Sequence, residues 1–166
     1  YRLFGYEMAL DLSGRRLGYE SHVPKLKEGG KENFNIRLAV NDDLPFVAGL
    51  YAETQKRYAI SCVRGADIFE YELNVQSRDG IPHNDIYIIE DEHGERLGYL
   101  QHPNFLGRVG MIVFGYELKP GTSWLAVTPG IVRYLWQCGQ EFAKRDNRAC
   151  TAFCFLLGLD HPVYQV

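Results

Sequence analysis

The chain has 166 residues, of which 46% are hydrophobic and 23% charged, and its formal net charge is -3 at pH 7. These values are typical of a folded globular domain and argue against a disordered chain. The basic residues are scattered, and no apolar run approaches the roughly 20 residues of a membrane-spanning helix. We therefore expect a cytoplasmic protein that binds neither nucleic acid nor membrane.

The spacing of the cysteines and histidines predicts neither a disulfide framework nor a metal site. No two of the four cysteines form a C-x-x-C pair, and Cys150 and Cys154 belong to the apolar run CTAFCFLLG. Buried reduced thiols fit that pattern better than a disulfide framework. The histidines show neither H-x-x-x-H nor Cys/His ligand spacing, so no metal site is predicted.

The first elements differ in composition from the rest of the chain. Residues 1 to 24 contain weak alternation and a turn, which predicts a strand or hairpin, and residues 25 to 34 are charged and glycine-containing, as in a linker. NIRLAV, residues 35 to 40, predicts a short strand. NDDLPFVAGLYAETQKRY then predicts a helix, with Asn41 as its cap and Pro45 within its first turn.

The middle of the chain predicts a helix followed by three strands. The helix is expected at about residues 65 to 76, and residues 85 to 102 alternate as a hairpin around the turn His93-Gly94. A further strand is expected over residues 109 to 118. Gly115 inside that strand indicates a bulge or a close approach of another backbone.

The stretch GTSWLAVTPGIVRYL, residues 121 to 135, predicts a strand that leads into a helix. Thr128 is expected to cap the helix and Pro129 to be its first residue, so that unpaired backbone N–H groups there favour an anion. An ordinary capped helix start without a ligand is the equal alternative. The helix is expected to end near Arg145, before a buried strand in CTAFCFLLG and a helix beginning in DHPVYQV. This order predicts an α/β fold with a mixed, mostly antiparallel central sheet flanked by helices.

The phrases IRLAVNDDLPFVAGLY, IIEDEHGERLGYLQH and HPVYQV, together with this element order, resemble the GNAT superfamily of acyl-CoA-dependent N-acetyltransferases. The resemblance covers residues 35 to 166. It implies the GNAT fold and an enzyme that transfers an acetyl group from acetyl-CoA to a small-molecule or peptide amine by direct attack. Its alternative is a degenerate, non-catalytic GNAT-like module that supports a partner domain or forms an oligomer interface.

The resemblance also extends to the N-terminus. YRLFGYEMALDL is similar to the phrase that leads into the last two strands of a GNAT unit. Residues 1 to 24 are therefore expected to be the end of a preceding unit, residues 25 to 34 a linker, and residues 35 to 166 a second unit without its own last strands. Residues 5 to 20 are the candidates to complete the sheet of this second unit.

The resemblance implies a site on the strand and helix that follow the hairpin. It makes Glu117 the candidate general base and Tyr164 the candidate general acid. The residues alone favour a solvated glutamate at position 117, and at position 164 they allow a tyrosine packed on the core at least as well as a general acid. The positions implied for acetyl-CoA binding are Val113, Phe114, Gly115, Tyr116, Thr128, Gly130 and Ile131. Trp124, Val127 and Pro129 depart from the family's glycine-containing signature, and this departure favours the non-catalytic alternative.

Overall fold

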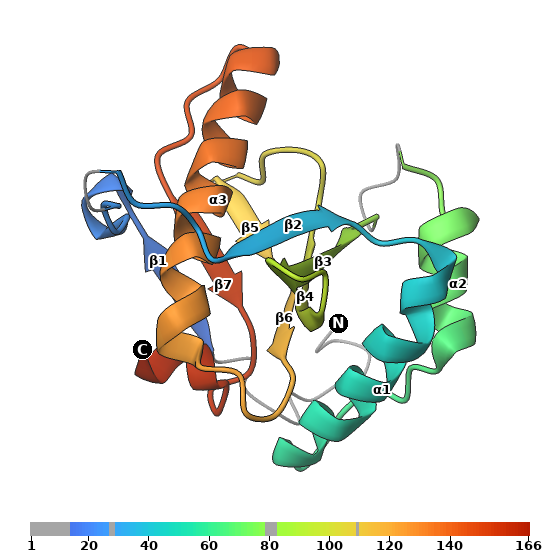
Figure 1. The fold of residues 1–166 in the computed structure, drawn as a ribbon. Helices are drawn as coiled ribbons and strands as arrows, with labels where there is room; N and C mark the ends of the chain where they lie inside the picture. Colours follow the sequence, from blue (N-terminus) through green and yellow to red (C-terminus); the bar gives the residue numbers. More distant parts are fainter. Residues whose placement is uncertain (1–13, 27–28, 79–82, 109) are drawn as a thin grey trace.

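Strands in the middle of the molecule are covered by helices on both sides (Figure 1). The computed structural model describes residues 14–26, 29–78, 83–108 and 110–166. In these residues a four-stranded antiparallel sheet has the order β2-β3-β4-β6, and a three-stranded sheet has the order β1-β7-β5. The GNAT-like prediction of a mixed, mostly antiparallel sheet is confirmed.

The four-stranded sheet contains the predicted hairpin. Its strands are β2 (Phe34–Leu38), β3 (Asp85–Asp91), β4 (Arg96–His102) and β6 (Gly115–Leu118). The Asp91 carboxylate accepts hydrogen bonds from the backbone N–H groups of His93 and Glu95, and Gly94 takes the positive φ of 80° that the turn requires. The alternation of side chains and the glycine turn therefore identified this hairpin correctly.

The three-stranded sheet joins the two ends of the chain. β7 (Phe153–Leu156) pairs in parallel with β5 (Met111–Val113) and antiparallel with β1 (Arg15–Gly18). Residues 15 to 18 thus pair with the sheet of this unit, while residues 1 to 13 lie outside the described residues. The assignment of residues 1 to 24 to a preceding unit stays a prediction.

The strand expected over residues 109 to 118 is divided in two. Phe114 separates β5 from β6, and its backbone N–H donates to the Gln101 carbonyl. Before this break the chain pairs with β7, and after it the chain pairs with β4. The chain therefore changes its pairing partner at Phe114, so that β6 and β7 belong to different sheets. This break lies next to Gly115, where the sequence predicts a bulge or a close backbone approach.

Helices pack on opposite sides of this layer. α1 (Leu44–Thr54), with the short helix η4 (Gln55–Arg57), and α2 (Ala66–Asn74) lie on one side, and α3 (Trp124–Arg145) lies on the other (Figure 1). Three further 3-10 turns are η2 (Glu20–His22), η3 (Asn41–Asp43) and η5 (Pro162–Gln165). The first helix starts at Leu44 because residues 41 to 43 form the 3-10 turn, so Asn41 does not cap α1.

The core has one part on each face of the sheets. One part lies between α3 and the sheets and includes Met111, Ile131 and Leu135. The other lies between the sheets and the pair α1 and α2 and includes Val47, Phe69 and Ile88. Burial of such side chains is the main stabilising contribution to a fold of this size. Cys150 and Cys154 are buried, as their apolar run predicted.

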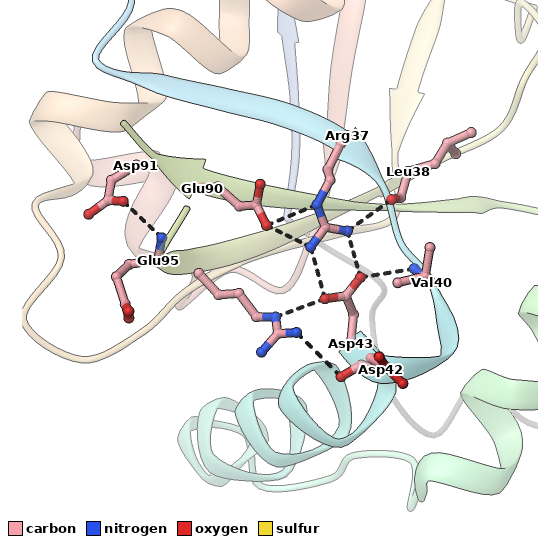
Figure 2. A network of polar contacts seen from close by, with 9 residues as sticks. Arg37, Leu38, Val40, Asp42, Asp43, Glu90, Asp91 and Glu95 are labelled. Atoms are coloured by element: carbon pink, nitrogen blue, oxygen red, sulfur yellow. Dashed lines mark hydrogen bonds and ion pairs between the residues drawn. The ribbon is translucent and has the colours of Figure 1, made fainter. Parts of the chain in front are cut away.

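Asp43 joins the first helix to three strands (Figure 2). Its fully buried carboxylate receives two hydrogen bonds from the Arg37 guanidinium, of 2.6 and 3.0 Å, and one of 2.8 Å from Arg96 Nε. Arg37 also binds Glu90 on β3. Burial alone would raise the pKa of Asp43, but the hydrogen bonds from Arg37, Val40 and Arg96 lower this pKa from 3.8 to about 2.

Candidate active site

A cavity of about 260 Å³ lies between the start of η5 and the side of the four-stranded sheet that α1 covers. Its floor is formed by strands β4 and β6, and its walls come from α1, η4, the loop between η4 and α2, and residues 156 to 161. The cavity is located where β6 and β7 separate. It is the natural candidate site, since strand ends and loops meet there.

Four neighbouring positions form the cavity floor. Tyr99 and Gln101 on β4 lie opposite Glu117 and Gly115 on β6 in the antiparallel register. A Cβ added at Gly115 would lie 3.1 Å from Gln101 Cβ, 3.2 Å from Gln101 Oε1 and 3.3 Å from Tyr99 Cε2. A side chain at residue 115 would therefore crowd Gln101 and Tyr99, and glycine lets these two side chains lie close to the β6 backbone.

Glu117 is a buried carboxylate on this floor. Its Oε2 accepts a hydrogen bond of 2.6 Å from Arg57 Nη2, and its Oε1 lies 3.7 Å from His161 Nε2. Arg57 Nη1 is buried and has no hydrogen-bond partner among the described residues. Arg57 therefore binds Glu117 from outside the cavity, since Glu117 lines the cavity and Arg57 does not.

His161 bridges the gap between β6 and η5. Its Nδ1 accepts a hydrogen bond from the Val163 N–H, so its Nε2 carries the proton and donates to the Tyr116 carbonyl at 2.7 Å. The indole of Trp124 packs edge-on against both rings, with centroids 5.0 Å from Tyr116 and 5.2 Å from His161. The gap is thus filled by aromatic side chains beside the cavity.

The opposite wall is held by a second ion pair. Arg64 Nη2 donates to Glu72 Oε1 at 2.6 Å, and the guanidinium lies over the rings of Tyr51 and Phe69, 5.2 and 4.2 Å from their centroids. The Tyr51 hydroxyl donates to the Cys62 carbonyl at 3.0 Å. These contacts fix the loop after η4 against α1 and α2.

Two further tyrosines complete the lining. Tyr58 packs against the backbone of Gly158, where an added Cβ would lie 2.3 Å from the ring. Tyr99 is 2% exposed, and its hydroxyl has no hydrogen-bond partner within the described part of the chain. Burial raises the pKa of both phenols, so both are neutral hydrogen-bonding groups at neutral pH.

The predicted helix start at Thr128 is wrong. α3 begins at Trp124, and Ser123 is its N-cap, with the hydroxyl accepting from the Ala126 N–H at 3.3 Å. Pro129 is tolerated inside α3 because the carbonyl that it cannot bond belongs to Leu125, which is 73% exposed in the first turn.

This earlier start changes the surroundings of three predicted cofactor residues. Thr128, Gly130 and Ile131 are buried within α3, and Ile131 belongs to the core. The Thr128 hydroxyl pairs with that of Tyr116 at 3.1 Å. Their backbone N–H groups are therefore not at the helix start, which lies instead at the junction of residues 119 to 125.

That junction has the form of a tight turn followed by a capped helix. The Thr122 N–H donates to the Lys119 carbonyl at 3.1 Å, and Gly121 has a φ of 88°, as a type II turn after Pro120 requires. At the first two helical positions, Trp124 and Leu125, no described group accepts from the backbone N–H.

Only some of the strand residues predicted to bind acetyl-CoA line the cavity. Phe114, Gly115 and Tyr116 line it, whereas Val113 is buried in β5 and does not. Tyr164 does not line it either. The Tyr164 hydroxyl contacts the Gly14 carbonyl and lies 3.0 to 3.2 Å from Leu157 N, Leu157 O and Phe155 O, so backbone groups surround it.

Other cavity residues were missed from the sequence. Tyr99 and Gln101 belonged to a correctly predicted strand, and their period-two spacing placed them on one face, but their partners across the sheet were unknown. His161 precedes Pro162 and belongs to no catalytic or metal-ligand motif that the sequence reveals. Its role depends on a contact with Tyr116, 45 residues away.

Comparison with known proteins supports the fold. No protein-family model and no curated protein matches the sequence. A protein from Enterococcus faecalis V583 described as a probable N-acyltransferase superposes with a TM-score of 0.51 at 12% identity, over 85% of this chain and 31% of that one. A GCN5-related N-acetyltransferase from Kribbella flavida gives a TM-score of 0.51 at 16% identity, over 91% and 32%.

The chain therefore has the GNAT fold of the acyl-CoA-dependent N-acetyltransferases, and it spans less than a third of the length of these two neighbours. Among the described helices, none combines the length and apolar character needed to cross a bilayer. In the same residues, no three histidine, cysteine or acidic side chains gather as metal ligands would.

Proposed function

We propose that this chain is an N-acetyltransferase that transfers the acetyl group of acetyl-CoA to an amine bound in the cavity. The observation that carries the proposal is Glu117, a buried carboxylate on the cavity floor in β6, which pairs with β4 after the chain has left β7 at Phe114. Its Oε1 has no hydrogen-bond donor among the described residues, whereas Oε2 is bound by Arg57. Oε1 is the atom that accepts a proton from the acceptor ammonium.

The backbone of β6 provides the second part of the reaction. The Tyr116 carbonyl faces the gap, since it accepts from His161, and in an antiparallel strand the N–H of the same residue points in the same direction. The Tyr116 N–H is therefore the candidate donor to the carbonyl oxygen of the thioester. Attack by the neutral amine forms the C–N bond, and the C–S bond breaks. The new amide nitrogen releases a proton to solvent, and the departing thiolate takes up a proton from solvent.

The corrected junction before α3 is the proposed place for the phosphate groups of acetyl-CoA. The open N–H groups of Trp124 and Leu125, the turn at Gly121 and the charge of Lys119 are complementary to an anion. The charge of this junction is complementary to a polyanionic substrate. The side chains of Trp124 and Leu125, however, keep a phosphate farther from the backbone than glycines at these positions would.

A second candidate function has its own support. His161 already occupies the Tyr116 carbonyl, and Trp124 packs beside it, so the gap through which an extended substrate would reach Glu117 is bridged. This arrangement favours a non-catalytic module that keeps the fold and serves a partner domain or an oligomer interface.

Titration calorimetry with acetyl-CoA separates the two functions. Leu125→Glu puts a negative charge at the α3 start and is expected to weaken acetyl-CoA binding by about tenfold or more. Val75→Glu is the matched control, since Val75 is also exposed (67%) but follows α2. Absence of binding to the unmodified protein would support the non-catalytic function, and equal effects of the two substitutions would place the phosphates elsewhere.

Catalysis is tested at Glu117. Glu117→Gln keeps the shape of the side chain and removes its capacity to accept a proton, so kcat is expected to fall by about 10²-fold or more with acetyl-CoA binding unchanged. Retention of full kcat would exclude Glu117 as the base.

A further inference from the structure

Three polar atoms on the cavity floor have no hydrogen-bond donor from the described residues. Gln101 Nε2 donates to Glu72 at 3.0 Å, which leaves Gln101 Oε1 as a free acceptor. Glu117 Oε1 is left free in the same way, because Arg57 binds Oε2. The Tyr99 hydroxyl is the third such atom, and it accepts as well as donates. All three belong to side chains that line the space over this floor.

We propose that this space is the recognition subsite for a primary monoamine that carries no carboxylate. A primary ammonium has three N–H donors, and three acceptors are available on the floor around it. The inference rests on the proposed function, since it takes the cavity as the acceptor site. Gly115 is important to the subsite, because a Cβ there would lie 3.1 to 3.3 Å from Gln101 and Tyr99 and would push these side chains from their positions.

The charges around the cavity select against amines that carry an acid group. Arg64, the cation among the described lining residues, is engaged by Glu72. Arg57 does not line the cavity; its Nη2 is bound by Glu117, and its Nη1 is buried without a partner among the described residues. The carboxylate of an amino acid would therefore meet no free cation on the cavity wall, which is strongly unfavourable. Tyr51, Tyr58 and Phe114 offer aromatic surface to an uncharged body instead.

The ligand test compares 2-phenylethylamine with phenylalanine, which differ by the carboxylate alone. Calorimetry on the unmodified protein is expected to give at least about tenfold tighter binding of 2-phenylethylamine. N,N-Dimethyl-2-phenylethylamine keeps the charge and the body but has one N–H, and it is expected to bind about tenfold more weakly than the primary amine. Equal or tighter binding of phenylalanine, or no binding of any of the three, would overturn the subsite.

A matched pair of glycine variants locates the subsite. Gly115→Ala is expected to weaken 2-phenylethylamine binding by about tenfold or more, since its methyl group would displace Gln101 and Tyr99, which carry two of the three acceptors. Gly49→Ala on α1 is the control, because a Cβ there meets nothing within 4 Å. Unchanged affinity in a folded Gly115→Ala variant would overturn the subsite, and the ligand comparison decides the question without any variant should that protein not fold.

Acetyl transfer is measured separately with the same amines. Selective binding of 2-phenylethylamine without its acetylation would overturn the proposed function and leave the subsite standing. Acetylation of phenylalanine in preference to 2-phenylethylamine would overturn the subsite and leave the proposed function standing.

Discussion

His161 Nε2 lies 2.7 Å from the carbonyl oxygen of Tyr116, and this hydrogen bond crosses the gap between β6 and the segment that follows β7. Both side chains are fully buried, and the ring of Trp124 packs against both of them. The contact therefore determines both the local stability of this gap and its accessibility.

His161→Ala is expected to lower the free energy of unfolding by about 2–3 kcal/mol, because it leaves the Tyr116 carbonyl buried without a donor. The accompanying local change is read from fluorescence. In a Trp136→Phe background Trp124 is the remaining tryptophan, and its emission should move to longer wavelength once the His161 ring is lost. An unshifted spectrum with unchanged stability would contradict the bridging role.

Asp43→Asn is expected to destabilise the protein in a pH-dependent manner. The pKa of Asp43 in the folded state is about 2, below its ordinary value of 3.8, so its contribution is complete above about pH 4 and is lost as the pH falls toward 2. The difference in stability between wild type and variant should be about 2 kcal/mol at pH 6.

Denaturant unfolding of both proteins at pH 6 and at pH 2 checks this expectation. The difference should shrink toward zero at the lower pH because the wild-type carboxyl group is then increasingly protonated. A constant difference over this range would mean that Asp43 acts through packing rather than through its charge.

Tyr164→Phe removes a hydroxyl that joins the end of β7 to the residue before β1. We expect a loss of about 1–2 kcal/mol of stability, since the Leu157 N–H and the Gly14 carbonyl lose a partner. We expect kcat to stay within about twofold, because the hydroxyl lies among backbone groups outside the cavity. Thermal denaturation and acetylation rates measure the two effects, and a large fall in kcat would instead restore Tyr164 as the general acid.

Ser123→Ala is expected to fray the start of α3 and to cost about 1 kcal/mol. Hydrogen exchange at the Ala126 amide is the direct measurement, since the Ser123 hydroxyl accepts from it. Thr128→Ala is the matched variant. It should leave that amide protected, because the Thr128 hydroxyl bonds to Tyr116 instead. Equal deprotection in both variants would show that the cap is not Ser123.

The sequence was most informative where the evidence is local. Alternation and a glycine turn identify the hairpin of β3 and β4, and apolar spacing identifies the three α-helices. The prediction of where α3 begins was wrong because Thr128-Pro129 satisfies the same capping rules as Ser123. Propensity rules rank both candidates alike, and only the packing of Thr128 against Tyr116 separates them.

The candidate site was less predictable because its parts come from distant segments. Glu117 was identified by position, but the ion pair with Arg57 spans 60 residues and no local pattern reveals it. The same holds for Gly115, whose position inside a strand was noticed. Gln101 and Tyr99, the two side chains that a Cβ at residue 115 would contact, belong to another strand.

The Asp43 network has a consequence for association between molecules. In the described sheets β2 is an edge strand of five residues, and its free side offers backbone groups to any other strand. Arg37 places a charge on this edge and ties the strand to Glu90 and Asp43. When acid protonates Asp43, Arg37 loses one of its two carboxylate partners, and fewer contacts then hold this edge strand in place. Sheet extension through β2 is therefore the expected route of aggregation at low pH.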